Sequence, residues 1–179
     1  MFAVQAQAQG TLNLVNNGDF SSALTAYGIW AFSPWNVSWS SSAGNPGGCA
    51  VLTNPQSGPT ILQNINGLIV GNIYTLSGDY QAVFSGGMPD GSGLHVSIDN
   101  ADENYFGSST WQTFSFNFIA SSTSDLLVLQ LLPNGDSSTY YNLDNISIVA
   151  YAVPEPSTCA LFLFGLAGFL GCRKRLKNL

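Results

Sequence analysis

Apolar and polar residues alternate along most of the chain between residues 11 and 151, as they do in β-strands that bury one face. The alternation is clearest in the segments GLHVSIDN, WQTFSFNF, IYTLSGDYQAVF and LDNISIVAY. Their inward positions are predicted to be Leu94, Val96, Ile98, Phe114, Phe116, Phe118, Tyr74, Leu76, Tyr80, Ala82, Phe84, Ile146 and Ile148. No segment before Thr158 keeps the 3.6-residue period of an amphipathic helix. The pattern therefore predicts an all-β fold for this region.

The segment DLLVLQLL is apolar at consecutive positions, which predicts a central strand that is covered on both faces. Turn signals separate this strand from the others, at Asn17-Gly18, Asn66-Gly67, Asp90-Gly91 and Asn134-Gly135. Eight or nine short strands with such turns between them predict an antiparallel β-sandwich, a jelly roll, for residues 11–151.

A different pattern begins after Val153. Residues 158–172 contain no charged residue and are apolar on every face of a helix. A helix of this length is about 22 Å long, which is shorter than the roughly 30 Å hydrocarbon core of a bilayer. Because the segment follows Pro154 and Pro156 and ends in a basic cluster, we predict a short transmembrane helix whose basic end snorkels to the interface.

The basic residues give the predicted orientation of this helix. The chain has ten Asp and Glu and four Lys and Arg, and the four basic residues all lie near its end, at Arg173, Lys174, Arg175 and Lys177. The positive-inside rule predicts that residues 173–179 form a basic cytoplasmic tail that stops transfer, and that everything before Val153 lies outside. A body without Lys or Arg cannot neutralise phosphates, which excludes nucleic acid as a partner.

The motif VPEPST, followed by a short apolar segment and RKRLK, resembles the PEP-CTERM sorting signal of exported bacterial proteins. The same region is also known as an ice-binding protein C-terminal domain. The resemblance implies that residues 152–157 are a Pro-rich sorting motif, in which an exosortase recognises Val153, Pro154, Glu155 and Pro156. It also implies cleavage near the motif and delivery of the body to the cell surface or exopolysaccharide matrix. The prolines suit this role, because they keep the segment extended.

Export implies a signal at the N-terminus. Residues 1–10, MFAVQAQAQG, carry small residues in an A-x-A pattern at Ala6 and Ala8, but they have no basic start and no full apolar stretch. We interpret them as the remnant of a signal peptide or as a disordered segment.

Four segments of the body resemble carbohydrate-binding modules of the galactose-binding-like jelly-roll class: NLVNNGDFSS, LQNINGLIVGNIYTLSGDYQA, STWQTFSFNFIASSTSDLLVLQLL and YYNLDNISI. The resemblance implies that an opening N-G-D-F strand lies near a closing D-N-I strand. It also implies a structural calcium there, with Asp19 and Asp144 as ligands, although Ser21 stands where many members have Glu. The alternative is that both aspartates bond backbone amides at turns and strand ends.

Aromatic residues are the candidates for sugar recognition. Trp30 and Trp35 lie in the segment AYGIWAFSPWNVSWSSS, and Tyr105 and Phe106 lie in NADENYFGSS. If they are exposed, their rings can stack on sugars while neighbouring amides and carboxylates bond the hydroxyls; if they are buried, the same rings cap the sandwich. We predict Trp30, Trp35 and Tyr105 as ligand-binding residues.

Catalysis is not predicted. Asp99, Asp102 and Glu103 form an acidic cluster and His95 is the single histidine, but the chain has no nucleophile elbow, Cys/His pair or phosphate loop. Two hypotheses follow: an exported glycan-binding module without catalytic activity, or a structural matrix component with no small-molecule site. The predicted partners are an exosortase, the bacterial membrane and extracellular polysaccharide, and the calcium ion is the one cofactor considered.

Overall fold

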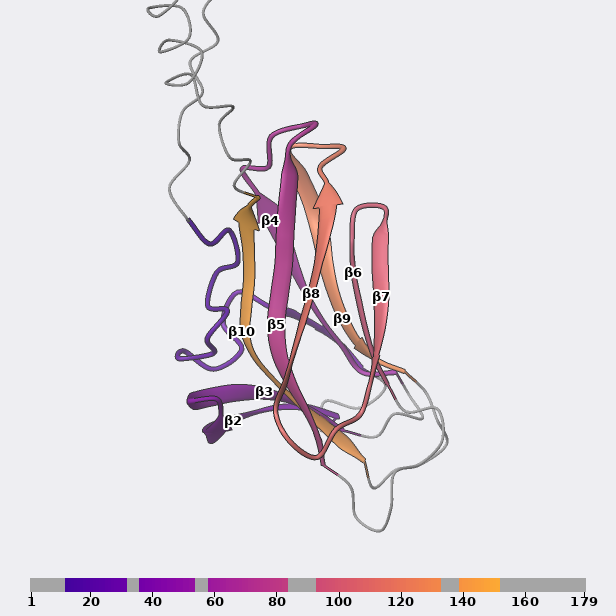
Figure 1. The fold of residues 1–179 in the computed structure, drawn as a ribbon. Helices are drawn as coiled ribbons and strands as arrows, with labels where there is room; N and C mark the ends of the chain where they lie inside the picture. The colour runs from indigo at the N-terminus through magenta and orange to yellow at the C-terminus, as the bar shows by residue number, and fades with distance from the viewer. Residues whose placement is uncertain (1–11, 32–35, 54–57, 84–92, 133–138, 152–179) are drawn as a thin grey trace, which may run out of the picture. The chain divides into compact units, whose positions relative to one another are not determined.

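Two antiparallel β-sheets pack face to face in the computed structural model, which describes residues 12–31, 36–53, 58–83, 93–132 and 139–151 (Figure 1). The described residues form ten strands: β1 (Gly28–Trp30), β2 (Val37–Gly44), β3 (Gly47–Thr53), β4 (Thr60–Asn66), β5 (Ile73–Val83), β6 (Gly93–Ile98), β7 (Ala101–Phe106), β8 (Gln112–Ile119), β9 (Ser124–Leu131) and β10 (Tyr140–Ala150). One sheet has the order β1-β4-β9-β6-β7 and the other β2-β3-β10-β5-β8. The predicted all-β sandwich is confirmed.

The alternating segments bury most of the side chains that the pattern predicted, and Phe84 lies outside the described residues. Leu94, Val96 and Ile98 of β6 are buried, while the residues between them are partly exposed. The same alternation holds in β5, and in β8 it holds with Phe116 half-buried. In β10 it holds from Asn145 onward, after four consecutive buried residues, 141–144. Each fully buried Leu, Ile or Phe stabilises the fold by roughly 1.5–3 kcal/mol relative to an exposed one. The core between the sheets is therefore built from one face of most of the strands.

The consecutive apolar run lies in β9, which is the central strand of its sheet, as predicted. Leu127, Leu129 and Leu131 face the core and are fully buried. On the opposite face Leu126 is partly exposed, so the outer side of this strand is not covered along its whole length.

The N-terminal segment differs from the opening strand that the resemblance implied. Residues 12–27 form a series of turns, with positive φ angles at Asn17, Phe20, Ala23 and Ala26. The segment nevertheless lies along β10, as expected, because the Leu14 N–H donates to the Ile148 carbonyl (2.9 Å) and the Ile146 N–H donates to the Gly18 carbonyl (2.8 Å). Turns replace the strand because these residues bond β10 at separate points.

Gly18 makes this approach possible. A Cβ atom at position 18 would lie 1.9 Å from the carbonyl oxygen of Ile146, a distance that no side chain tolerates. The Asn17-Gly18 turn predicted from the sequence is thus confirmed, and its glycine is required by contact with the last strand.

The acidic segment is a strand rather than a loop. A two-residue turn at Asp99-Asn100 joins β6 to β7, and Asp99 has a φ of 53°. β7 is an edge strand, and most of its side chains are exposed. Its polar composition suits an edge, where charged side chains discourage pairing with other chains.

Several predictions concern residues outside the described ranges. They include the signal remnant 1–10, the sorting motif 152–157, the helix 158–172 and the tail 173–179. Within the described ranges the structure has no helix long and apolar enough to cross a membrane.

Candidate functional site

A row of side chains crosses the outer face of the sheet β1-β4-β9-β6-β7 from edge to edge. Residues paired directly in antiparallel strands place their side chains on the same face. The register joins five such residues in line, and we call them the polar row: Trp30, Thr60, Gln130, His95 and Asn104. Since the neighbouring positions of β6 point into the core, the row lies on the outer side of the sheet, where Trp30 and Asn104 are exposed. His95 and Gln130 are half-buried there, and Thr60 is buried. Four strand spacings give it a length of about 19 Å.

Aromatic side chains lie at both edges of this face. Trp30, on the edge strand β1, is 62 % exposed. Phe106 is also 62 % exposed; it lies two residues beyond Asn104 on the edge strand β7, and therefore on the same face of the sheet. The predicted residue Trp35 lies outside the described ranges. Two rings thus flank a line of hydroxyl, amide and imidazole groups.

Hydrogen bonds orient the polar groups of the row. His95 Nδ1 and Asn104 Oδ1 lie 2.9 Å apart across the β6–β7 pair. The Thr60 hydroxyl and the Gln130 amide both donate to the carbonyl oxygen of Gly58, at 3.0 and 3.4 Å. These bonds fix the side chains before any ligand arrives, which lowers the entropy that binding costs.

A hollow of about 480 Å³ extends from the row along the same face. Gly28 and Leu62 line it, and they form the register pair two residues from Trp30 and Thr60. Its full lining combines amides with a small apolar floor: Asn16, Ala26, Gly28, Leu62, Gln63, Asn64, Asn66 and Leu126. Such a mixture of apolar surface and a few polar groups is common in small-molecule sites.

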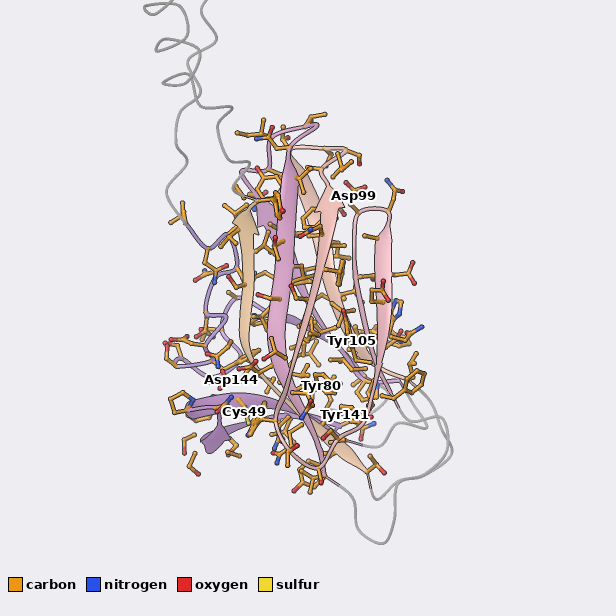
Figure 2. The ribbon with its side chains drawn as sticks, viewed as in Figure 1. Cys49, Tyr80, Asp99, Tyr105, Tyr141 and Asp144 are labelled. Atoms are coloured by element: carbon orange, nitrogen blue, oxygen red, sulfur yellow. The ribbon has the colours of Figure 1, made fainter. Side chains whose placement is uncertain are left out.

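Tyr105, the third predicted ligand-binding residue, does not lie on the outer surface. It is half-buried and lies between the sheets, with its ring centroid 5.9 Å from that of Tyr80 and 5.2 Å from that of Phe114 (Figure 2). Burial raises the pKa of Tyr105, with smaller contributions from Glu103 and Tyr80. The exposed aromatic residue of this strand is its neighbour Phe106.

Two other aromatic residues of the Trp-rich segment tie the N-terminal turns to the sandwich. The Trp39 indole N–H donates to the Phe20 carbonyl at 2.8 Å, and the Tyr27 ring stacks on the Phe20 ring with centroids 5.1 Å apart. Trp30 is therefore free to act as a platform, whereas Tyr27 packs against Phe20 and Trp39, although 39 % exposed, is held to Phe20 by its indole N–H.

The buried carboxylate of Asp144 lies near the middle of β10, where the register shifts (Figure 2). Its oxygens accept the N–H groups of Asn45 (2.5 Å) and Asn145 (2.7 Å). Burial raises the pKa of Asp144; the two N–H bonds lower it, and Asp79 and Asp19 raise it again, so the net direction is upward. Asp144 therefore carries its charge at a cost to the folded state.

Asp19, the second predicted calcium ligand, lies near enough to Asp144 to act on its charge. The Asp19 carboxylate is exposed and accepts the Ser21 N–H at 3.2 Å, within its own turn. Across the described part of the chain, no three His, Cys, Asp or Glu side chains group closely enough to hold a metal ion. Calcium takes six to eight oxygen ligands, so these residues fit amide bonding better than a cation. The calcium site stays a prediction.

The acidic cluster does not form facing carboxylates. Asp102 pairs with the outward-facing Ser97, whereas Glu103 pairs with the inward-facing Val96, so the two acids point to opposite faces of β7. Asp99 lies at the turn and bonds Ser121. The paired carboxylates of a glycosidase share one cleft, and these three residues do not share one.

Sequence reasoning did not single out Thr60, Gln130 or Asn104. Each was visible only as an outward polar position in a period-two strand, and many such positions exist. Their alignment depends on register across four strand pairs, which the sequence pattern does not contain.

Comparison with protein-family models identifies the end of the chain. Residues 152–175 match the PEP-CTERM protein-sorting motif, which indicates an exported protein sorted to the cell surface. The match covers the predicted residues Val153, Pro154, Glu155 and Pro156 and the first three basic residues. A comparison with curated proteins gives no match.

Several solved structures with a similar fold are carbohydrate-binding modules. TmCBM61, in complex with beta-1,4-galactotriose, has a TM-score of 0.62 and 11 % identity, over 79 % of this chain and 100 % of its own. A family 16 carbohydrate-binding module has a TM-score of 0.59 and 19 % identity, over 76 % and 99 %. The CBM22-1 xylan-binding domain from Paenibacillus barcinonensis Xyn10C has a TM-score of 0.57 and 18 % identity, over 82 % and 99 %. Some similar structures are enzymes, including an α-L-arabinofuranosidase. At these identities the likeness establishes the jelly-roll fold.

Proposed function

We propose that the body of this exported protein binds a neutral polysaccharide, without catalysis, through the polar row and the rings that flank it. The observation that carries the proposal is the alignment of Trp30 with Gln130, His95 and Asn104 on one exposed face of a sheet. Sugars have apolar C–H faces that stack on aromatic rings, and hydroxyl groups that pair with amides and imidazole.

The length and charge of the face restrict the class of ligand that it can bind. A row of about 19 Å suits a chain of several sugar units better than one monosaccharide. No described residue is Lys or Arg, so this face has no permanent cation to pair with a sulfate or uronate group. A neutral, extended glycan fits both features. The bound β-1,4-galactotriose of TmCBM61 and the xylan of the CBM22-1 domain make galactan and xylan the first ligands to test.

The absence of catalysis is part of the proposal. Asp102 and Glu103 point to opposite faces, and His95 bonds the neutral Asn104 rather than an acid. A general base of the usual kind needs a partner that orients it and a substrate group within reach. The polar row offers hydrogen bonds and ring faces, which are sufficient for binding.

Sorting completes the proposal. An exosortase would recognise Pro154, Glu155 and Pro156, while residues 158–172 span the membrane and Arg173, Lys174, Arg175 and Lys177 stay in the cytoplasm. About 1 kcal/mol of attraction per basic residue to an anionic leaflet supports this orientation. Cleavage near the motif would then release the body to the cell surface or matrix.

The binding test is affinity electrophoresis of the full chain in mild detergent, through native gels that contain β-1,4-galactan, xylan or an anionic polysaccharide. We expect retardation by a neutral polymer, and Trp30→Ala should weaken it about 5- to 10-fold, which corresponds to about 1 kcal/mol of lost ring contact. The matched control is Ile119→Ala, an equally exposed apolar side chain at the other end of the sandwich. If neither neutral polymer retards the wild type, the chain is a structural matrix component instead.

The sorting test is the intact mass of the surface protein from cells with and without an exosortase. When the exosortase is present, we expect the intact mass to be lower by the mass of the cleaved C-terminal segment. A surface protein that keeps residues 157–179 in both strains would contradict cleavage at the motif.

A further inference from the structure

Five large apolar side chains are exposed together where β10 ends. We call them the apolar end: Ile69, Val70, Ile73, Ile119 and Tyr151, each between 37 % and 63 % exposed. Ile73 and Ile119 are register partners of β5 and β8. The Tyr151 N–H donates to the Ile73 carbonyl at 2.9 Å, so three of the five side chains follow one another across the sheet. A hollow of about 710 Å³ lies beside them.

The backbone under the apolar end is fixed by hydrogen bonds. The Gly71 N–H donates to the Ala120 carbonyl (2.8 Å), and the Ala120 N–H donates to the Asn72 carbonyl (3.0 Å). The Ile69 N–H donates to the hydroxyl of the buried Tyr74 at 2.9 Å. The fold therefore holds these side chains outward on a rigid base. Contiguous apolar surface of this kind, rimmed by polar residues, marks an interaction site.

Two acids near this end accept hydrogen bonds from within the protein. The Asp99 carboxylate accepts two bonds from Ser121, and Asp125 Oδ1 accepts the Leu126 N–H at 2.7 Å. These bonds come from neutral donors and leave the charge of a carboxylate in place, and the surface around the five apolar side chains also carries the asparagines Asn72, Asn100 and Asn117. Neutral polar groups around apolar ones match the headgroup boundary of a bilayer, where Tyr is also favoured.

The position of the C-terminal tail indicates what covers the apolar end. Tyr151 is joined to the apolar segment 158–172 by only six residues, 152–157, which span at most about 20–22 Å when extended. We infer that the apolar end docks on the lipid interface while the chain is anchored, with Ile69, Val70 and Ile119 inserted among the headgroups. This inference rests on the proposed membrane anchoring of residues 158–172.

Docking orients the two ends of the body. The apolar end lies at the last residues of β10 and the first of β5. Thr60, the first residue of β4, and its partner Trp30 on β1 lie at the opposite end of the sandwich (Figure 1). A body seated on its apolar end therefore presents the polar row away from the lipid.

The experiment uses the full chain in liposomes of phosphatidylethanolamine and phosphatidylglycerol, without exosortase so that the tail is kept. A photocrosslinking benzoyl-phenylalanine replaces one residue at a time: Val70 and Ile119 in the apolar end, Phe106 as an equally exposed control at the other end, and Leu166 as a reporter of anchoring. Mass spectrometry measures lipid adducts after irradiation, and near-UV circular dichroism checks that each variant folds.

We expect lipid adducts at Leu166, and at Val70 and Ile119 at least five-fold above Phe106. Adducts at Leu166 with only background at both apolar-end positions would overturn the inference and leave anchoring intact. Equal labelling of Phe106, or adducts of Val70 and Ile119 with a second copy of the chain, would also overturn it. No adduct at Leu166 would overturn the anchoring and the inference with it.

Discussion

The carboxylate of Asp99 accepts two hydrogen bonds from Ser121, one from the N–H at 2.6 Å and one from the hydroxyl at 2.7 Å. The two residues are far apart in sequence, so this pair ties the β6–β7 turn to the connection between β8 and β9. Asp99 also has a positive φ, which Asn tolerates as well as Asp does.

Asp99→Asn is expected to destabilise the protein at neutral pH and not at low pH. The bonds from the Ser121 hydroxyl and N–H lower the pKa of Asp99 from its ordinary value of 3.8. A lowered folded pKa gives stability that is present above the ordinary value and is lost as pH falls through the folded value. Because the carboxylate is exposed, we expect a loss of about 0.5–1 kcal/mol. Urea unfolding of both proteins across pH measures it, with Asp102→Asn, at an exposed acid of the same hairpin, as the matched control.

Asp144 should give a pH dependence of the opposite sign. Burial raises its pKa above 3.8, so the folded state holds this proton more tightly than the unfolded chain does. The stability due to Asp144 is therefore greatest below the ordinary value and falls as pH rises through the window between that value and the raised folded value. Asp144→Asn should remove this slope. It should also cost about 1–3 kcal/mol at neutral pH, because one amide N–H of Asn45 or Asn145 loses its acceptor. If the variant keeps the same pH dependence of stability, another group must cause it.

Calcium should have little effect on stability. The oxygens of Asp144 already accept two N–H groups, and we expect calcium or a chelator to move the thermal midpoint by less than about 1 °C. Scanning calorimetry of the wild type, with Asp144→Asn as the control, measures this. A large rise with calcium that Asp144→Asn abolishes would instead support the predicted ligands Asp144 and Asp19.

Gly18→Ala is expected to be strongly destabilising. Its Cβ would lie 1.9 Å from the Ile146 carbonyl oxygen, a backbone atom that cannot move without disturbing β10. Overpacking of this kind costs about 3 kcal/mol. Gly28→Ala is the matched control, because nothing lies closer than 3.8 Å to its added Cβ, and surface changes stay within about 0.5 kcal/mol. Equal urea midpoints for the two variants would show that the N-terminal turns do not pack on β10 as described.

Cys49 should resist alkylation in the folded protein. Burial raises its pKa from 9.0 to about 11, with a further contribution from Asp144. The thiolate is the reactive form, so its fraction at neutral pH is about 100-fold lower than at the ordinary pKa. Timed iodoacetamide labelling followed by peptide mass spectrometry should show slow modification of Cys49, and full modification in urea. Rapid labelling without denaturant would contradict its burial.

The strand pattern could be predicted because burial of one face leaves a period of two in the sequence. Leu94, Val96 and Ile98 face the core for this reason. β7 escaped prediction because an exposed edge strand buries too little to leave such a period, and its acids favour a loop interpretation. Beyond the predicted Asn17-Gly18 turn, the N-terminal turns escaped prediction because positive φ angles at non-glycine residues such as Phe20 and Ala23 leave no signal in the sequence.

The candidate site was predictable in its residue types and not in its arrangement. Trp30 could be named from its loop-like, polar surroundings, and it is exposed. Tyr105 could not be distinguished from Phe106, because their facing depends on how β7 pairs with β6. Gln130 and His95 meet only through the pairing of β9 with β6, which joins segments distant in sequence.

If the apolar end docks on lipid as inferred, the length of β4 sets the distance between the membrane surface and the polar row. Six residue steps separate Asn66 from Thr60 along this strand, or about 20 Å. The Debye length at physiological ionic strength is about 8 Å, so the surface potential of anionic lipid has largely decayed at that height. Recognition of a neutral glycan by an anchored chain should then be independent of the lipid composition beneath it.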